Sequence, residues 1–130
     1  MINWNNLDTL ASFTQLKKTK EVNLSDVMSG EAGAERVKIY NVPMACGLNY
    51  NYAAKKVDSE VLNALVKLAD EAQLADKFKA LYNGEVINTG EKRLVLHHMT
   101  RGQLGDAVNA DGVDKRSFYK TQQERIAEFA

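Results

Sequence analysis

Residues 71–103, EAQLADKFKALYNGEVINTGEKRLVLHHMTRGQ, carry the signals that decide how this 130-residue chain folds. Apolar side chains at helical spacing lead up to Tyr82. Asn83-Gly84 follows, and a glycine at that point supplies the positive φ with which many helices end. The pattern therefore predicts a helix that stops at Tyr82.

The next signals lie beyond that stop. Asn88 and Glu91 have the spacing of a capping box, although such a box normally begins with Ser or Thr. We therefore expect residues 92–100 to be helical, followed by a glycine-containing loop over residues 101–112. From Asp114 a last helix is expected to run to the end of the sequence, where no C-terminal cap signal is found.

Upstream of this stretch, Asp58 is placed to cap a helix with a wide apolar face, and the helical spacing continues from there to the stop at Tyr82. Before it, residues 37–40 and 48–52 predict the two strands of a small β-hairpin. In the second strand apolar and Asn residues alternate, which is typical of a half-buried strand. Residues 30–33 contain two glycines and predict a loop.

The N-terminal part predicts two short helices. The first has a stripe of apolar residues at helical spacing, and its members are Trp4, Leu7, Leu10, Phe13 and Leu16. The second is capped by Asn23 or Ser25 and ends near Gly30. The whole pattern predicts one domain of the α+β class, mostly helical, with short helices around a small β-hairpin.

The composition excludes several classes of function. The 17 basic and 17 acidic residues balance, which argues against nucleic acid and against an anionic membrane surface as partners. No run approaches the ~20 apolar residues of a membrane-spanning helix, and the N-terminus lacks the features of a signal peptide. One cysteine, Cys46, can build neither an internal disulfide nor a thiolate metal site, so we expect a cytoplasmic protein.

His97 and His98 are the candidate metal ligands. Adjacent helical positions point about 100° apart, no H-E-x-x-H pattern is present, and no acidic residue lies one turn away. We therefore expect no metal or other cofactor. One imidazole should instead pack inward with a bonded nitrogen, and the other should lie near the surface.

Arg93 and Arg101 are the candidate anion-binding residues. Each could hold a phosphate or carboxylate with two hydrogen bonds, and each could equally pair with Glu85, Glu91 or a neighbouring domain. The absence of a Ser/Thr-rich or phosphate-binding glycine loop favours the structural interpretation.

Other candidates are weaker. The glycines around Glu31, Glu35 and Arg36 match neither the P-loop nor the dinucleotide spacing. Cys46 has no nearby histidine to activate it. We find no arrangement that forms an active site.

Two blocks resemble a known family. Residues 81–93 read LYNGEVINTGEKR and residues 94–101 read LVLHHMTR. They are similar, in order, to the M-F-x-G-x-x-I-N-x-T-E-x-R and A-V-L-H-x-A-L-R segments near the N-terminus of glucose-6-phosphate isomerases. Residues 51–55, NYAAK, stand where that family has its D-Y-S-K-N-like strand exit. Gly90 and residues 98–100 depart from the pattern.

The resemblance implies an aldose–ketose isomerase of glycolysis and gluconeogenesis, a homodimer that interconverts glucose 6-phosphate and fructose 6-phosphate through an enediol and needs no cofactor. The family's catalytic and phosphate-binding residues lie in later α/β sugar-isomerase domains, so no catalytic or substrate-binding residue carries over to residues 1–130. The motif residues that carry over are expected to be structural, and they are Gly84, Arg93, His97 and Arg101.

Two hypotheses stay open at this point. In the first, the chain is an N-terminal portion of such an isomerase, inactive alone and exposing an apolar surface for the absent domains. The isolated chain would then aggregate, form oligomers or unfold without sharp cooperativity. In the second, it is a self-standing helical interaction module without catalytic activity.

Overall fold

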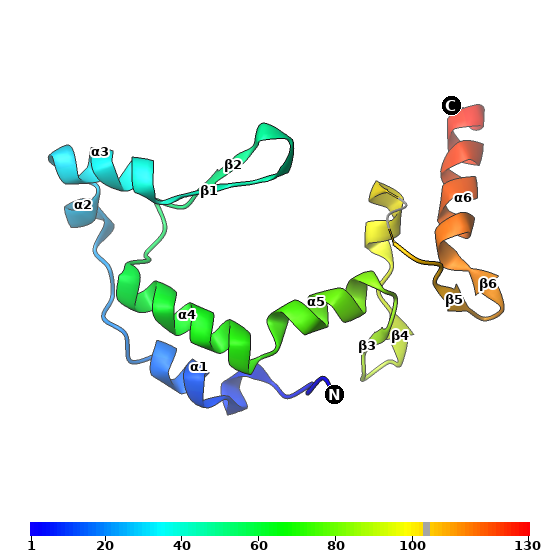
Figure 1. Ribbon diagram of the computed structural model, residues 1–130, viewed down its shortest axis with the longest axis horizontal. Helices are drawn as coiled ribbons and strands as arrows, with labels where there is room; N and C mark the ends of the chain where they lie inside the picture. Colours follow the sequence, from blue (N-terminus) through cyan, green and yellow to red (C-terminus); the bar gives the residue numbers. More distant parts are fainter. Residues whose placement is uncertain (103–104) are drawn as a thin grey trace. The chain divides into compact units, whose positions relative to one another are not determined.

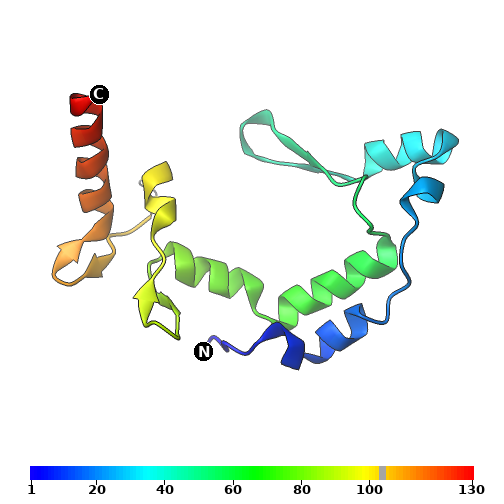
Figure 2. The same ribbon diagram turned by 180° about the vertical axis from the view of Figure 1, so that it is seen from behind.

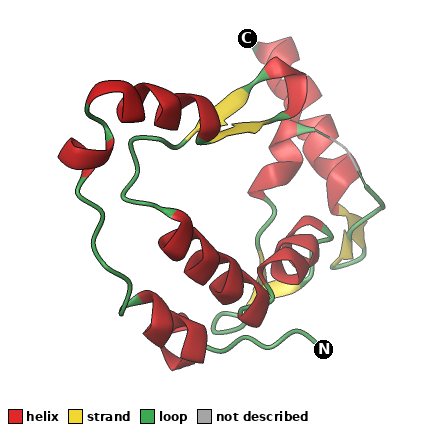
Figure 3. Ribbon diagram, turned by 60° about the vertical axis from the view of Figure 1, so that its left-hand side comes forward, coloured by secondary structure: helices red, strands yellow, loops and turns green. Residues whose placement is uncertain are grey.

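The computed structural model describes residues 1–102 and 105–130. The described chain is mostly helical with short antiparallel hairpins, which confirms the α+β prediction (Figures 1 and 3). It divides into two compact units. Residues 5–72 form one unit, and residues 73–130 form the other together with residues 1–4.

The unit of residues 5–72 contains helices and one hairpin. Its elements are the 3-10 helix η1 (Leu7–Thr9), α1 (Ala11–Leu16), α2 (Leu24–Val27), α3 (Gly30–Ile39), β1 (Asn41–Pro43), η2 (Ala45–Gly47), β2 (Asn49–Asn51) and α4 (Ser59–Glu71).

Helices α1 and α4 pack against each other in this unit (Figures 1 and 2). The N-cap position of α1 has no capping side chain of its own. The Glu71 carboxylate at the end of α4 accepts hydrogen bonds from the backbone N–H groups of Ala11 (3.2 Å) and Ser12 (2.8 Å) instead. The carboxylate on α4 thus accepts from N–H groups in the first turn of α1, which have no acceptor within their own helix.

The predicted cap of α4 is confirmed. Asp58 Oδ1 accepts a hydrogen bond from the Val61 N–H at 2.8 Å, and α4 begins at the next residue, Ser59. The Asn23 cap is confirmed as well, because Asn23 Oδ1 accepts from the Ser25 N–H at 3.1 Å.

The hairpin is present, but its predicted first strand is wrong. Residues 37–39 are the last turn of α3, and β1 starts only at Asn41. The predicted loop at residues 30–33 is wrong too, because it forms the first turn of α3. Gly33 is needed there for packing rather than flexibility, since a Cβ would lie 2.2 Å from the Met28 carbonyl oxygen.

In the other unit, the described residues form three helices and two hairpins. Its elements are α5 (Leu74–Tyr82), β3 (Val86–Asn88), β4 (Arg93–Leu94), the 3-10 helix η3 (His97–Arg101), β5 (Asn109–Ala110), β6 (Val113–Asp114) and α6 (Lys115–Phe129).

The predicted stop after Tyr82 is confirmed. Gly84 has a φ of 73°, its N–H donates to the Leu81 carbonyl at 3.1 Å, and the Glu85 N–H donates to the Ala80 carbonyl at 2.9 Å. These are the two hydrogen bonds of a Schellman motif. The helical run before it is interrupted at Gln73, which has a φ of 53° and separates α4 from α5.

The predicted helix over residues 92–100 is wrong. The chain forms the hairpin of β3 and β4 and then the 3-10 turn η3. Asn88 Oδ1 does accept a hydrogen bond from the Glu91 N–H at 3.1 Å, but it closes the hairpin turn, and Lys92 follows with a φ of 53°. The same side-chain bond that caps a helix also stabilises a turn.

The loop predicted over residues 101–112 contains the short strand β5, and its residues 103 and 104 lie outside the described chain. Few apolar side chains of residues 1–102 and 105–130 are buried: Val22, Ala53 and Ala72 in the unit of residues 5–72, and Ala80, Met99 and Val108 in the other unit. Many large apolar side chains of the described residues are exposed.

Candidate functional site

The four motif residues lie in the unit of residues 73–130, but they do not converge on one point. Gly84 and Arg93 line a broad hollow of about 820 Å³. His97 and Arg101 lie at the two ends of η3, and both are exposed. Neither η3 residue is among those that line the hollow.

The hollow beside β3 and β4 has mixed charge. Glu85 and Asp111 line it together with Lys92 and Arg93. The Arg93 guanidinium lies 3.8 Å from a Glu91 carboxylate oxygen, and both side chains are mostly exposed. Glu91 is one of the pairing partners that the sequence offers for Arg93, and an exposed pair of this kind contributes little to stability. Opposite charges around the hollow do not create a strong anion site.

Gly84, which lines this hollow, packs closely against Val108. A Cβ built on it would lie 2.3 Å from Val108 Cγ1, and Val108 is buried. Only a residue without a side chain fits between the end of α5 and the segment that leads into β5. The motif glycine therefore meets both a backbone requirement and a packing requirement.

His98 behaves as the structural interpretation predicts. Its ring is half-buried and stacks on Tyr82 with 5.1 Å between centroids, whereas His97 is exposed. His98 Nε2 lies 3.1 Å from the Tyr82 carbonyl oxygen. A carbonyl only accepts, so Nε2 carries the proton in this contact.

Arg116 is the main residue of this unit that the sequence reasoning missed. It is 5% exposed, and its Nη2 donates to the same Tyr82 carbonyl at 2.8 Å while its Nε donates to the Asp106 carbonyl. Its guanidinium lies over the Tyr82 ring, 5.2 Å from the centroid. Arg116 thus connects α5, α6 and the segment before β5.

Asp114 joins two elements of the same unit. Its Oδ1 accepts from the Arg116 N–H (3.1 Å) and the Val108 N–H (3.3 Å), and Ser117 Oγ donates to Oδ2 at 2.5 Å. These donors favour the charged form, so the Ser117 hydroxyl first, and then the backbone N–H groups, lower the pKa of Asp114 from its ordinary value of 3.8.

This lowered pKa predicts a pH dependence. A carboxyl whose pKa is lower in the folded state contributes stability above its unfolded pKa, and the contribution is lost as pH falls through the folded value. We expect Asp114→Asn to be less stable than the unsubstituted chain at pH 7, with the difference narrowing below about pH 4. Urea unfolding of both proteins from pH 7 to pH 2.5 measures this, and a difference that stays constant with pH would contradict it.

The unit of residues 5–72 has its own buried arginine. Arg36 on α3 is 7% exposed and donates to the carbonyls of Ala53 (2.8 Å), Lys55 (3.1 Å) and Val57 (2.5 Å). Its guanidinium also lies 3.9 Å from the centroid of the Tyr40 ring. Three hydrogen bonds to backbone carbonyls make Arg36 a clamp on residues 53–57 rather than an open anion site.

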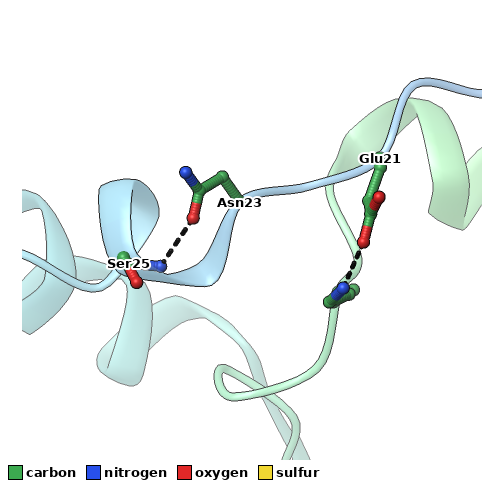
Figure 4. Close-up of polar contacts among 4 residues, drawn as sticks. Glu21, Asn23 and Ser25 are labelled. Atoms are coloured by element: carbon green, nitrogen blue, oxygen red, sulfur yellow. Dashed lines mark hydrogen bonds and ion pairs between the residues drawn. The ribbon is translucent and has the colours of Figure 1, made fainter.

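A hollow of about 430 Å³ lies near α2 in the same unit, and its lining includes Glu21, Asn23, Ser25 and Lys56. The Lys56 ammonium donates a hydrogen bond to the Glu21 carboxylate. Figure 4 shows Glu21 together with the bond between Asn23 and Ser25. The Lys56 hydrogen bond and charge lower the pKa of Glu21. The two charged groups of this hollow, Glu21 and Lys56, therefore pair with each other, and Asn23 Oδ1 accepts from the Ser25 N–H.

The described residues provide no assembled catalytic chemistry. Among residues 1–102 and 105–130, no three His, Cys, Asp or Glu side chains gather closely enough to hold a metal ion. In that same part of the chain no helix has both the length and the apolar character needed to cross a membrane.

Fold and site together define a class: a mostly helical α+β segment in which the motif glycine, Gly84, meets a backbone requirement and a packing requirement. The sequence profile of the phosphoglucose isomerase family matches residues 51–130, so the chain belongs to the phosphoglucose isomerase family.

Individual relatives agree over nearly the whole chain. It is 48% identical to the glucose-6-phosphate isomerase of Treponema denticola over 132 residues, 44% identical to that of Treponema pallidum over 133, and 37% identical to that of Borreliella afzelii over 132. These alignments cover 98–100% of this chain but only 24–25% of each relative. The chain therefore spans about a quarter of the length of the curated relatives it matches.

Proposed function

We propose that this chain is the N-terminal, mainly helical segment of a cytoplasmic glucose-6-phosphate isomerase. The observation that carries the proposal is the family match, which includes the motif block of residues 81–101 and extends at 37–48% identity over nearly the whole chain. The quarter-length coverage supports an assignment to one segment of the enzyme.

The proposed reaction interconverts glucose 6-phosphate and fructose 6-phosphate. A proton moves between C1 and C2 of the open sugar through an enediol, which requires a carboxylate base placed next to the carbon. The described residues hold no such carboxylate in an enclosed site, so the base and the phosphate-binding groups belong to the remaining three quarters of the enzyme. The whole protein is proposed to be a homodimer without a cofactor.

This chain then contributes structure rather than chemistry. Gly84 ends α5 against Val108, while His98 and Arg116 hold the Tyr82 carbonyl at that same helix end. These contacts fix the motif block in one conformation. Arg93, His97 and Arg101, which remain exposed, are available to contact the rest of the enzyme.

A chimera tests the proposal. In the T. denticola isomerase, the quarter that aligns with this chain is replaced by residues 1–130, and the parent isomerase is the control. We expect the chimera to fold and to retain glucose 6-phosphate isomerisation within about tenfold of the parent kcat/KM, a loss of about 1.4 kcal/mol or less. A chimera that folds but does not turn over the sugar phosphate would contradict the proposed function.

A further inference from the structure

Residues 41–51 form a hairpin arm that extends from the end of α3 (Figure 1). Contacts at its base fix its direction. The Tyr52 N–H donates to the Tyr40 carbonyl at 2.9 Å, Asn51 Nδ2 donates to the Val37 carbonyl at 2.6 Å, and the rings of Tyr40 and Tyr52 lie 5.0 Å apart. The arm therefore projects from a well-anchored base.

The register separates the arm into an apolar face and a polar face. Val42 pairs with Tyr50, whereas Asn41 pairs with Asn51 and Pro43 with Asn49. Met44 and Leu48 extend the two strands by one residue each, and the Met44 N–H donates to the Leu48 carbonyl at 2.7 Å. Side chains alternate between faces along a strand, so one face carries Val42, Met44, Leu48 and Tyr50.

This apolar face is exposed. The exposed fractions are 47% for Val42, 56% for Met44, 64% for Leu48 and 50% for Tyr50. The alternation predicted from the sequence is confirmed, but the predicted half-burial of Leu48 and Tyr50 is wrong for the isolated chain. Apolar groups at this spacing are expected to be buried against another layer.

The arm also lacks the usual protection of a free sheet edge. Natural edge strands carry charged residues, especially lysine, that discourage pairing with other chains. No charged residue occurs from Tyr40 to Tyr52, although 26% of the chain is charged. In the described part of the chain β1 and β2 pair only with each other. A lone two-stranded hairpin is marginally stable in water, so a covering partner is expected.

We propose that the apolar face of this arm docks on the part of the same isomerase polypeptide that lies outside residues 1–130. This proposal rests on the proposed function, and it names the partner of one surface. About three quarters of each curated relative's length lies outside the matched segment, which supplies a covalently linked partner.

A second copy of the chain is the less favourable occupant. A stable interface between separate proteins buries about 800 Å² on each partner, contributed by roughly 20–30 residues a side. The arm has only eleven residues, and four side chains make up its apolar face. Linkage within one polypeptide removes most of the entropy that association costs, so a small apolar face can dock within a chain where it could not hold two chains together.

Hydrogen–deuterium exchange tests the proposal directly. The peptide containing residues 41–51 is followed by mass spectrometry in the isolated chain and in the chimera. We expect at least about tenfold slower exchange in the chimera, because docking covers the arm and stabilises its N–H groups. Equal exchange in an active chimera would overturn the docking proposal while leaving the proposed function intact.

Substitutions on the two faces supply the matched control. Tyr50→Lys places a charge on the apolar face, and Asn49→Lys places the same charge on the polar face. In the chimera, Tyr50→Lys should abolish the slow exchange and lower the melting temperature, whereas Asn49→Lys should do neither. In the isolated chain Asn49→Lys should be silent because the position is exposed, and Tyr50→Lys should lose only the contact between the Tyr50 and Tyr52 rings, whose centroids lie 6.2 Å apart. Equal effects of the two substitutions in the chimera would contradict a docked apolar face.

The remaining outcomes also decide the question. Exchange that slows at residues 41–51, and not elsewhere, as the concentration of the isolated chain rises would identify a second copy as the occupant and overturn the proposal. A chimera that does not fold or does not turn over contradicts the proposed function and the arm's proposed partner together.

Discussion

Replacing Gly84 with alanine should lower the free energy of unfolding of the 73–130 unit by about 2–4 kcal/mol. Two separate causes contribute. A non-glycine residue at a φ of 73° is strained, and the new Cβ would lie 2.3 Å from Val108 Cγ1. Val108 is buried, so its short branched side chain has little room to move away.

Alanine substitutions at two other glycines of the same unit distinguish backbone strain from steric overlap with Val108. Gly112 has a φ of 72°, but a Cβ there would meet no atom of the described residues within 4 Å, so Gly112→Ala should show the backbone strain alone. Gly90 has a Cβ position with only an Asn88 side-chain oxygen nearby, at 3.7 Å, so Gly90→Ala should change little. Urea unfolding measures all three, and a Gly84→Ala loss equal to that of Gly112→Ala would show that contact with Val108 is unimportant.

Replacing Arg36 with methionine should destabilise the 5–72 unit by about 3–5 kcal/mol. The substitution keeps an unbranched apolar stem but leaves the carbonyls of Ala53, Lys55 and Val57 without their donor. It also removes the cation that lies over Tyr40. Arg36→Lys should recover only part of the loss, since an ammonium group cannot reproduce the planar fork.

The control for this substitution lies on the same helix. Lys38 on α3 is exposed and has only a 3.4 Å contact with Glu35, so Lys38→Met should be nearly neutral. Urea unfolding gives the loss, and hydrogen exchange over residues 53–57 shows whether it is local to the clamp. If Arg36→Met were as mild as Lys38→Met, the clamp would not be an important support of this unit.

Local signals in the sequence correctly predict several helix ends. Asp58 caps α4, Asp114 caps α6, and Gly84 ends α5, because each effect depends on one side chain and its nearest backbone groups. The alternation around Tyr50 likewise gave the correct faces of the hairpin.

Predictions failed where one local signal suits two structures. The Asn88–Glu91 bond closes a hairpin turn instead of capping a helix. The outcome is the hairpin because β4 pairs with β3, and the spacing of Asn88 and Glu91 alone does not indicate that pairing. Gln73 interrupts a continuous helical pattern at a φ of 53°, although glutamine gives no local signal for that conformation.

The sequence predicts only part of the site, for a related reason. Gly84 could be identified as a motif residue, but its contact with Val108 joins positions 24 residues apart. Arg36 and Arg116 were missed as buried supports, because arginine is mostly exposed in proteins and their acceptors are carbonyls distant in sequence. Every residue has the same backbone carbonyl, so the residue type does not indicate which carbonyls need a side-chain donor.

The most direct test of the central claim is a coupled assay of glucose 6-phosphate isomerisation on the isolated chain and the T. denticola chimera, side by side. If this chain is a structural segment of the isomerase, the chimera turns over at a rate close to the parent enzyme and the isolated chain shows no turnover above buffer. Turnover by the isolated chain at an enzyme-like rate, or a folded chimera without activity, would contradict the account.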